Sequence, residues 1–525
     1  MKIQLTALML FALLFLASCG TSISEKDKMA NYIPDNAGMV MRLNPQSFMD
    51  KADFEAVKKM PFFQDMLKEA KAESKELAGI FENPANSGID LTKSSFISLF
   101  FDGKKEPRIG VYLPLDDRSR FEQVLSASTA DFAQSEYEGG TFYSKGSGGF
   151  VVYDDRAILI YGEQKNYEGL IADTGGSIAQ NKNFAKFTKG KGDMSFWMHS
   201  APFMEMMGAS QAVQALKMFK EDDLKNNFSH GYVNFEKGAI EMEVKSYLSS
   251  GLKSDLSLIF GDGISHDFSR DFPGQHLQGI YTFSISPRGI YQLSKEYMLS
   301  GMVEQEAEDK LGVTMSELTK AFSGDIAAAF YLPDNIGDGT DMLGKNGGMI
   351  YAFETKNKKI FHKMINNLVE TGLLTQDGDT YSIGGTMGKG IKFYRKSDIF
   401  YAVFSKDNAL FDQLVSGDFG TPSDIQKKIK KISKKHLASF VFQPGFLREM
   451  SDLDVPKLIE QLVGMEGAYG MDDGFLKTTF KDESVNSLKL FMEAINNAYL
   501  MDQKKKDSPT INEAPPENTT ETMEM

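Results

Sequence analysis

Apolar residues recur at two different periods along this chain. Residues 231–238 (GYVNFEKG) and 238–248 (GAIEMEVKSYL) alternate apolar and polar positions, which is typical of half-buried strands. Residues 107–125 begin as an apolar strand and continue as a helix-like stretch. Proline at a first helical position, as in Asn44-Pro45, marks a helix start. Because strands and helices mix without a regular βαβ alternation, the sequence predicts an α+β fold with mostly antiparallel sheets and packed helices.

The same order of elements occurs twice. The strand and helix of 107–125 recur at 347–372, and the hairpin and helix of 148–175 recur at 390–417. Matching residues lie 241 to 243 positions apart: Pro45 and Pro287, Tyr153 and Tyr394, Asn166 and Asn408, Asp193 and His436. The sequence therefore predicts a tandem duplication, with one α+β lobe at 31–260, a second at 270–502 and a junction near 261–273.

The first twenty residues have the pattern of a targeting signal. Lys2 precedes an apolar run from Leu5 to Leu16, which is shorter than the ~20 residues that a membrane span needs. The following Leu16-Ala17-Ser18-Cys19 resembles the lipobox of bacterial lipoproteins. That resemblance implies a signal peptide at 1–18 and lipid on Cys19. An ordinary signal peptide with a chance cysteine is the alternative.

Gly20, rather than Asp, follows the cysteine. By analogy with the sorting rule of such lipoproteins, this implies the outer membrane, on either its periplasmic or its surface-exposed side. Residues 19–30 are polar and aperiodic and are interpreted as a tether. Residues 503–525 are polar and rich in proline, which predicts a disordered tail.

Composition narrows the classes of function. Cys19 is the only cysteine, so the remaining chain holds no disulfide and no thiolate metal site. The 58 Lys and Arg against 72 Asp and Glu give a net charge of −14, which disfavours a nucleic-acid partner.

The candidate catalytic and metal motifs are poor. Residues 339–346 (GTDMLGKN) approach a phosphate loop but lack its Ser or Thr, so a glycine-rich connection is the preferred interpretation. A cluster in the predicted junction fits no zinc spacing: His266, Asp267, Asp271 and His276. The sequence therefore predicts no cofactor, no metal and no catalytic residue. A spatial Ser-His-Asp set stays open.

A methionine-rich stretch at 201–220 is the candidate ligand-binding segment. Methionine-rich faces adapt to varied apolar partners, although such residues at helical spacing also form cores. The residues expected to line a seam between the lobes are Phe203, Met204, Met207, Met218 and Phe219. Residues 443–465 are their expected helical counterpart in the second lobe. The expected partner is an apolar ligand or an envelope protein, besides the membrane that holds the lipid anchor.

Residues 32–54 (YIPDNAGMVMRLNPQSFMDKADF), followed by 87–96 (SGIDLTKSSF), resemble uncharacterised envelope lipoproteins of Bacteroidetes-type Gram-negative bacteria, which share a domain of unknown function. The resemblance implies a cell-envelope location and brings no site residues. The expected function is therefore a lipid-anchored envelope protein that binds or scaffolds through two lobes. A hydrolase acting on an envelope polymer is the alternative.

Overall fold

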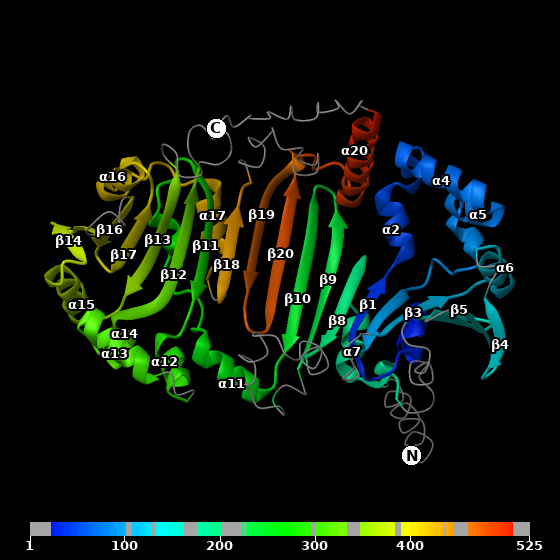
Figure 1. Cartoon of the computed structure of the whole chain (residues 1–525), viewed down its shortest axis with the longest axis horizontal. Coiled ribbons are helices and arrows are strands. Elements are labelled where there is room, and N and C mark those ends of the chain that lie inside the picture. Colours follow the sequence, from blue (N-terminus) through cyan, green and yellow to red (C-terminus); the bar gives the residue numbers. More distant parts are fainter. Residues whose placement is uncertain are drawn as a thin grey trace, which may run out of the picture.

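The protein contains one large open antiparallel sheet with helices packed along it (Figure 1). The computed structural model describes residues 23–100, 108–128, 132–145, 148–161, 176–200, 223, 227–296, 300–332, 347–383, 390–434, 436–444 and 460–507. The predicted α+β class with antiparallel sheets is confirmed in these residues.

The strands of the first part of the chain form one half of the sheet. Their order from the outer edge inward is β4, β5, β6, β7, β3, β2, β1, β8, β9, β10. Their bounds are β1 (Ala37–Leu43), β2 (Ser95–Phe100), β3 (Arg108–Pro114), β4 (Ala133–Tyr137), β5 (Gly140–Lys145), β6 (Gly148–Val152), β7 (Arg156–Tyr161), β8 (Met194–His199), β9 (Phe228–Glu236) and β10 (Ala239–Tyr247).

The later strands form the other half of the sheet. Their order from the centre outward is β20, β19, β18, β11, β12, β13, β17, β16, β15, β14. Their bounds are β11 (Leu277–Ser284), β12 (Phe322–Tyr331), β13 (Gly348–Thr355), β14 (Leu374–Asp377), β15 (Thr380–Ile383), β16 (Ile391–Lys396), β17 (Ile399–Phe404), β18 (Ala438–Phe442), β19 (Leu462–Tyr469) and β20 (Asp473–Phe480).

The two halves of the sheet join through backbone hydrogen bonds at its centre. β10 and β20 pair antiparallel, with Met242 opposite Leu476 in the middle of the ladder. Ala239 lies opposite Thr479 at one end, and Lys245 lies opposite Asp473 at the other. The sheet is therefore continuous across the region that the sequence assigned to two lobes.

Helices line the edges of the sheet and the side that carries Val40, Trp197 and Val441, which we call the reverse side. Their bounds are η1 (Glu25–Tyr32), α2 (Pro45–Ala52), α3 (Phe54–Val57), α4 (Pro61–Glu73), α5 (Lys75–Glu82), η2 (Pro84–Ser87), α6 (Arg118–Ser128), η4 (Ile178–Gln180), α7 (Lys182–Thr188), α11 (Ser250–Ile259), η5 (Phe268–Arg270), α12 (Pro287–Glu296), α13 (Ser300–Leu311), α14 (Met315–Ala321), α15 (Lys358–Glu370), α16 (Ala409–Ser416), α17 (Asp424–Ile432) and α20 (Ser487–Asp507). At the outer strands β13 and β17, α15 packs on the side opposite to the reverse side. The predicted helix starts at Pro45 and Pro287 are confirmed.

Two helix pairs lie at opposite ends of the central strands (Figure 1). α20, from the end of the chain, packs against α2 near its beginning, and Lys489 Nζ lies 2.7 Å from Asp53 Oδ2. α11 packs against α12, where Gly289 lies next to the backbone of Leu258. In each pair, the helix that follows β20 or β10 packs against a helix from the other half of the sheet.

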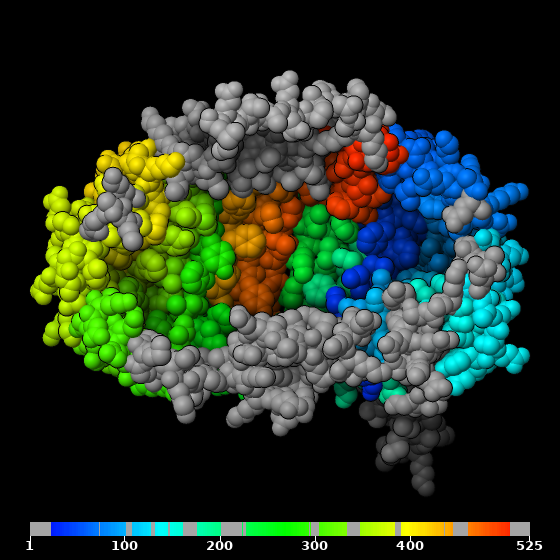
Figure 2. Space-filling model, viewed as in Figure 1, coloured from blue at the N-terminus to red at the C-terminus, as the bar shows by residue number. Residues whose placement is uncertain are grey.

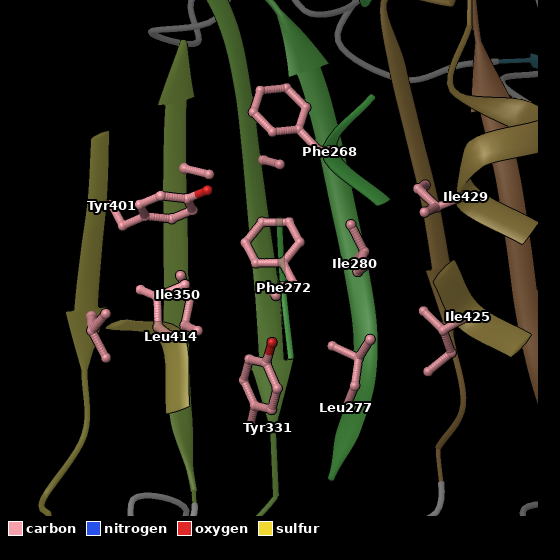
Figure 3. Close-up of a cluster of buried hydrophobic side chains, with 14 of the residues drawn as sticks. Phe268, Phe272, Leu277, Ile280, Tyr331, Ile350, Tyr401, Leu414, Ile425 and Ile429 are labelled. Carbon is pink, nitrogen blue, oxygen red and sulfur yellow. The ribbon is translucent and has the colours of Figure 1, made fainter. Parts of the chain in front are cut away.

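The principal cores lie on the reverse side of the sheet. In the second half, strand residues such as Ile280, Ile350 and Tyr401 face α17 and the segment around η5 (Figure 3). In the first half, Trp197 and Phe96 belong to a cluster with residues of η1 and α7. These side chains are less than 2 % exposed, which is the burial expected of a close-packed core.

Three predicted boundaries need correction. Met29 and Ala30, assigned to a flexible tether, lie in η1 and are buried in the first core. Ile264 and Phe268, assigned to the junction, are buried in the second core. These segments gave no periodic signal because η1 and η5 are short 3₁₀ helices, of eight and three residues. α20 also extends to Asp507, beyond the predicted start of the tail at 503.

The prediction of a helix at 443–465 is also wrong for its last residues, from Leu462 onward. Leu462–Tyr469 is β19, which pairs with β18 on one side and β20 on the other. Tertiary pairing overrides the apolar spacing that suggested a helix. Most of the remaining segment, 445–459, lies outside the described residues.

Candidate functional site

The register of the central strands places apolar side chains on one face. Residues directly opposite each other in an antiparallel sheet share a face, so each row of partners can be followed across strands. One row runs from Leu43 through Met194, Val233, Met242, Leu476, Gly467 and Phe440 to Tyr281.

We call the set of apolar side chains on this side of the eight central strands the open face. It comprises Met39, Met41, Leu43, Met194, Phe196, Met198, Val233, Ile240, Met242, Val244, Leu476, Met465, Phe440, Phe442, Tyr281 and Phe283.

The open face is partly exposed along its whole length. None of its side chains is fully buried, and Tyr281 is 39 % exposed. Among the strand residues that alternate with them, Val40, Trp197 and Val441 are at most 2 % exposed. Figure 2 shows the central strands recessed between the two ends of the molecule. A continuous exposed apolar surface of this kind marks an interaction site in a soluble domain.

The reverse side of the two innermost strands, β10 and β20, is charged. On β10, Glu241, Glu243 and Lys245 alternate with the apolar residues of the open face. Lys477 Nζ lies 2.7 Å from Glu241 Oε1, so the two innermost strands are linked by an ion pair on this side. The centre of the sheet therefore exposes a charged surface to solvent on one side and an apolar surface on the other.

Two apolar cavities deepen the open face in the second half. One, of about 310 Å³, lies against Tyr281, Phe283 and Tyr469. The other, of about 330 Å³, lies between α12, α14 and the sheet, and Ile285 lines both. Volumes of this order lie at the lower end of those that hold small ligands.

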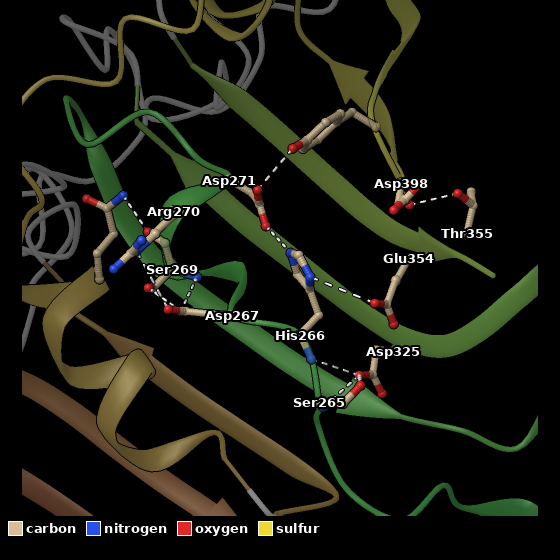
Figure 4. A network of polar contacts seen from close by, with 12 residues as sticks. Ser265, His266, Asp267, Ser269, Arg270, Asp271, Asp325, Glu354, Thr355 and Asp398 are labelled. Atoms are coloured by element: carbon tan, nitrogen blue, oxygen red, sulfur yellow. Dashed lines mark hydrogen bonds and ion pairs between the residues drawn. The ribbon is translucent and has the colours of Figure 1, made fainter.

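Three of the four residues considered as metal ligands, His266, Asp267 and Asp271, form ion pairs instead. His266 Nε2 lies 2.5 Å from Asp271 Oδ2, and its Nδ1 lies 3.9 Å from Glu354 Oε1 (Figure 4). Asp267 accepts a hydrogen bond from Ser269 and pairs with Lys430, so its carboxylate contacts these two residues and not His266. Within the described ranges, no group of three or more His, Cys, Asp or Glu is arranged to hold a metal ion.

The same network has a defined electrostatic character. Burial alone would lower the pKa of His266, but the hydrogen bond and charge of Asp271, together with Glu354, raise it above its ordinary value. Below this histidine, Asp325 Oδ2 accepts hydrogen bonds from the backbone N–H and the hydroxyl of Ser265. The cluster fixes the segment before η5 on the sheet.

The predicted site residues lie outside the described part of the chain. These are Cys19, Phe203, Met204, Met207, Met218 and Phe219. The open face was missed as a site, although its strands at 231–248 were predicted. The alternation of Ile240, Met242 and Val244 with charged residues was the available signal, but it does not tell which side is covered.

Comparison with known proteins places the chain in a family. A family model described as a domain of unknown function (DUF4836) matches residues 29–376, and the chain belongs to this family. This agrees with the expectation of an uncharacterised family.

Solved structures give only distant similarity. Crystal forms I and III of TP0453 match with TM-scores of 0.25 and 0.26 and identities of 10 % and 9 %. These alignments cover 44 % and 47 % of this chain and 84 % and 90 % of TP0453. No curated protein matches the chain. In the described residues, no helix is both long enough and apolar enough to cross a membrane.

Proposed function

We propose that this protein is a lipid-anchored component of the cell envelope that binds acyl chains of an envelope lipid on its open face. The observation that carries the proposal is the row of apolar residues from Leu43 through Met242 and Leu476 to Tyr281, with charged residues on the reverse side of β10 and β20. The lipobox-like sequence ending in Cys19 supports a position at a membrane surface, where such a ligand is abundant.

The composition of the open face favours flexible apolar ligands. Methionine side chains are unbranched and polarisable, so they repack around chains of different length and curvature. Met39, Met41, Met194, Met198, Met242 and Met465 contribute to the surface. The adjoining cavities beside Tyr281 and between α12 and α14 offer depth for the end of a chain.

The proposal includes an internal duplication. The strand order of the first half, β4 to β7, then β3, β2, β1, β8, β9 and β10, matches the order β14 to β17, then β13, β12, β11, β18, β19 and β20. The pairing of β10 with β20 is symmetric about Met242 and Leu476, as a twofold relation between the halves requires. The helix pairs α20 with α2 and α11 with α12 have the same reciprocal arrangement.

The hydrolase alternative receives less support. A general acid needs a carboxyl group whose pKa is raised toward neutrality. Burial alone would raise the pKa of Asp155 and of Asp267, but hydrogen bonds and neighbouring charges lower both: Arg156 and Lys28 act on Asp155, and Ser269 and Lys430 act on Asp267. Such shifts keep these carboxylates ionised and describe structural ion pairs.

A fluorescent fatty acid tests the proposal directly. The full chain should bind cis-parinaric acid saturably. Met242→Gln places a polar amide in the middle of the open face and should weaken binding about tenfold, because apolar burial contributes roughly 25 cal/mol per Å². Glu243→Gln, one residue away on the reverse side, is the matched control and should bind as the unchanged protein does.

Equal affinity of both variants for the fatty acid would exclude the open face as its site. Mass spectrometry of lipids extracted from the purified full chain then supplies the natural ligand. If Met242→Gln leaves fatty acid binding intact but dissociates an oligomer or a protein partner, the surface is a protein interface and the lipid proposal is wrong.

A further inference from the structure

A polar cavity of about 510 Å³ lies in the first half, apart from the open face. Its walls come from η1, the end of β1, the start of α2 and the loop 188–193 between α7 and β8. We propose that this cavity binds an anionic carbohydrate, of about one sugar unit carrying a carboxylate or phosphate group.

The cavity is built around a buried arginine. Arg42, which is 6 % exposed, donates from Nη1 to Thr188 O at 2.7 Å and from Nη2 to Gly190 O at 2.6 Å. Its Nη2 also lies 3.1 Å from Ser195 Oγ. These bonds hold the loop 188–193 against the end of β1, so the wall is fixed before any ligand arrives.

The ion pair of Lys51 with Asp193 holds another wall of the cavity. Asp193 is buried and accepts hydrogen bonds from Ser47 Oγ at 2.5 Å, Lys51 Nζ at 2.8 Å and the backbone N–H of Phe235 at 2.7 Å. α2 is thereby fixed to the sheet. With three donors on its two oxygens, the carboxylate of Asp193 is a positioning group of the cavity.

Three buried polar atoms of the cavity have no hydrogen-bond partner among the described residues. They are Ser94 Oγ, Asp27 Oδ1 and Asn44 Oδ1, and all three residues line the cavity. Ser94 is 1 % exposed and Asp27 is 4 % exposed. A buried polar group without a partner costs on the order of 1–3 kcal/mol, so these atoms favour a ligand that bonds to them.

The unpartnered atoms define the neutral part of the ligand. Asp27 Oδ1 and Asn44 Oδ1 only accept hydrogen bonds, whereas the Ser94 hydroxyl both donates and accepts. Vicinal sugar hydroxyls offer donors and acceptors together and can satisfy all three. A fully ionised anion such as sulfate offers no donor to the two acceptors, and inorganic phosphate offers only one or two hydroxyls. A metal cation would meet the guanidinium of Arg42, 3.6 Å from Asp27 Oδ1.

The rim defines the charged part of the ligand. Lys26, Lys189 and Lys191 line the cavity, and the side chains of Lys189 and Lys191 are exposed. With Arg42 and Lys51, they outnumber the acidic residues of the cavity, Asp27 and Asp193. In a chain with a net charge of −14, this local excess of positive charge concentrates anions at one place.

Titration of the full chain with three small probes tests the assignment. Glucuronic acid, glucose and inorganic phosphate are compared by saturation-transfer NMR and calorimetry. Glucuronic acid should bind saturably, and glucose and phosphate should each bind at least about tenfold more weakly, because each supplies only part of the contacts. Binding of phosphate as tight as that of glucuronic acid, or of glucose as tight, would overturn the proposal, as would no saturable binding of glucuronic acid.

Matched variants locate the site. Ser94→Ala removes one unpartnered hydroxyl, and Lys189→Gln with Lys191→Gln removes two rim charges on exposed side chains without touching the core. Each should weaken glucuronic acid binding about tenfold. Lys356→Gln with Lys359→Gln changes the net charge equally in the second half and should leave binding unchanged. Unchanged binding in the rim variant would place the ligand elsewhere and refute the proposal.

Discussion

At the scale of single residues, His266 was a candidate metal ligand in the sequence and is part of an ion-pair network in the structure. Its ring lies between Asp271 and Glu354, and Tyr401 donates a hydrogen bond to the other oxygen of Asp271 at 3.3 Å. The sequence displayed the histidine and the aspartates but not their partners on β13 and β17. Since those partners follow in the chain by 88 and 135 residues, only the fold could reveal that the cluster is an ion-pair network.

His266→Gln should destabilise the protein in a pH-dependent way. The folded-state pKa of His266 is raised above 6.5, so its stabilising contribution is complete below pH 6.5 and is lost as the pH rises through the folded-state value. We expect a loss of about 1–2 kcal/mol in unfolding free energy at pH 6 and a smaller loss at pH 9, measured by urea unfolding.

His362→Gln is the control for this titration. This exposed histidine has a pKa lowered by partial burial and by Arg395, so its replacement should cost no more at pH 6 than at pH 9. An equal loss at both pH values for His266→Gln would mean that the ring acts through packing and not through charge.

At the scale of secondary structure elements, close helix contacts depend on small residues. A Cβ added to Gly289 of α12 would lie 1.6 Å from the carbonyl oxygen of Leu258, at the end of α11. Gly289→Ala should therefore force the two helices apart and reduce the unfolding free energy by about 2 kcal/mol, measured by urea unfolding.

Gly79→Ala provides the matched helical glycine. Its added Cβ would meet only Asn86 Nδ2 at 3.9 Å, so the gain in helix propensity of about 1 kcal/mol should dominate and stabilise the protein. Destabilisation of both variants to the same extent would contradict the proposed role of the contact between α11 and α12.

Local patterns predicted many elements and few of their partners. The strands at β3, β9, β10 and β13 and the helix starts at Pro45 and Pro287 were readable, because alternation and caps are local signals. The pairing of β10 with β20 was not readable, since Met242 and Leu476 are far apart in sequence. Nor was the open face, because alternation gives the two sides of a strand without saying which side other elements cover.

At the scale of the whole molecule, anchoring is a separate question from folding. The lipobox-like motif predicts that Cys19→Ala abolishes lipid attachment and detergent partitioning, while the folded residues from η1 onward are unaffected. Fractionation in Triton X-114 with the unchanged chain as control measures this. Membrane retention of the variant equal to that of the unchanged chain would refute lipidation at Cys19.

The continuous sheet and its helices hold the two halves of the molecule together. Although the chain passes between the halves near Asp262, three kinds of contact cross the same boundary. β10 pairs with β20, α20 packs on α2 and α11 packs on α12. The ion pair of Lys489 with Asp53 and that of Lys253 with Asp472 add to these contacts at opposite ends of the central strands.

A protease site inserted between Asp262 and Gly263 should therefore be cut without separating the halves. Asp262 is exposed, so the enzyme can reach the bond. The two fragments should co-elute in native gel filtration, because a central β ladder and two reciprocal helix pairs still join them, and should separate only in denaturant. Elution of two independent folded fragments in native buffer would show that each half is self-sufficient, and the open face would then be split at Met242 and Leu476 into two smaller surfaces.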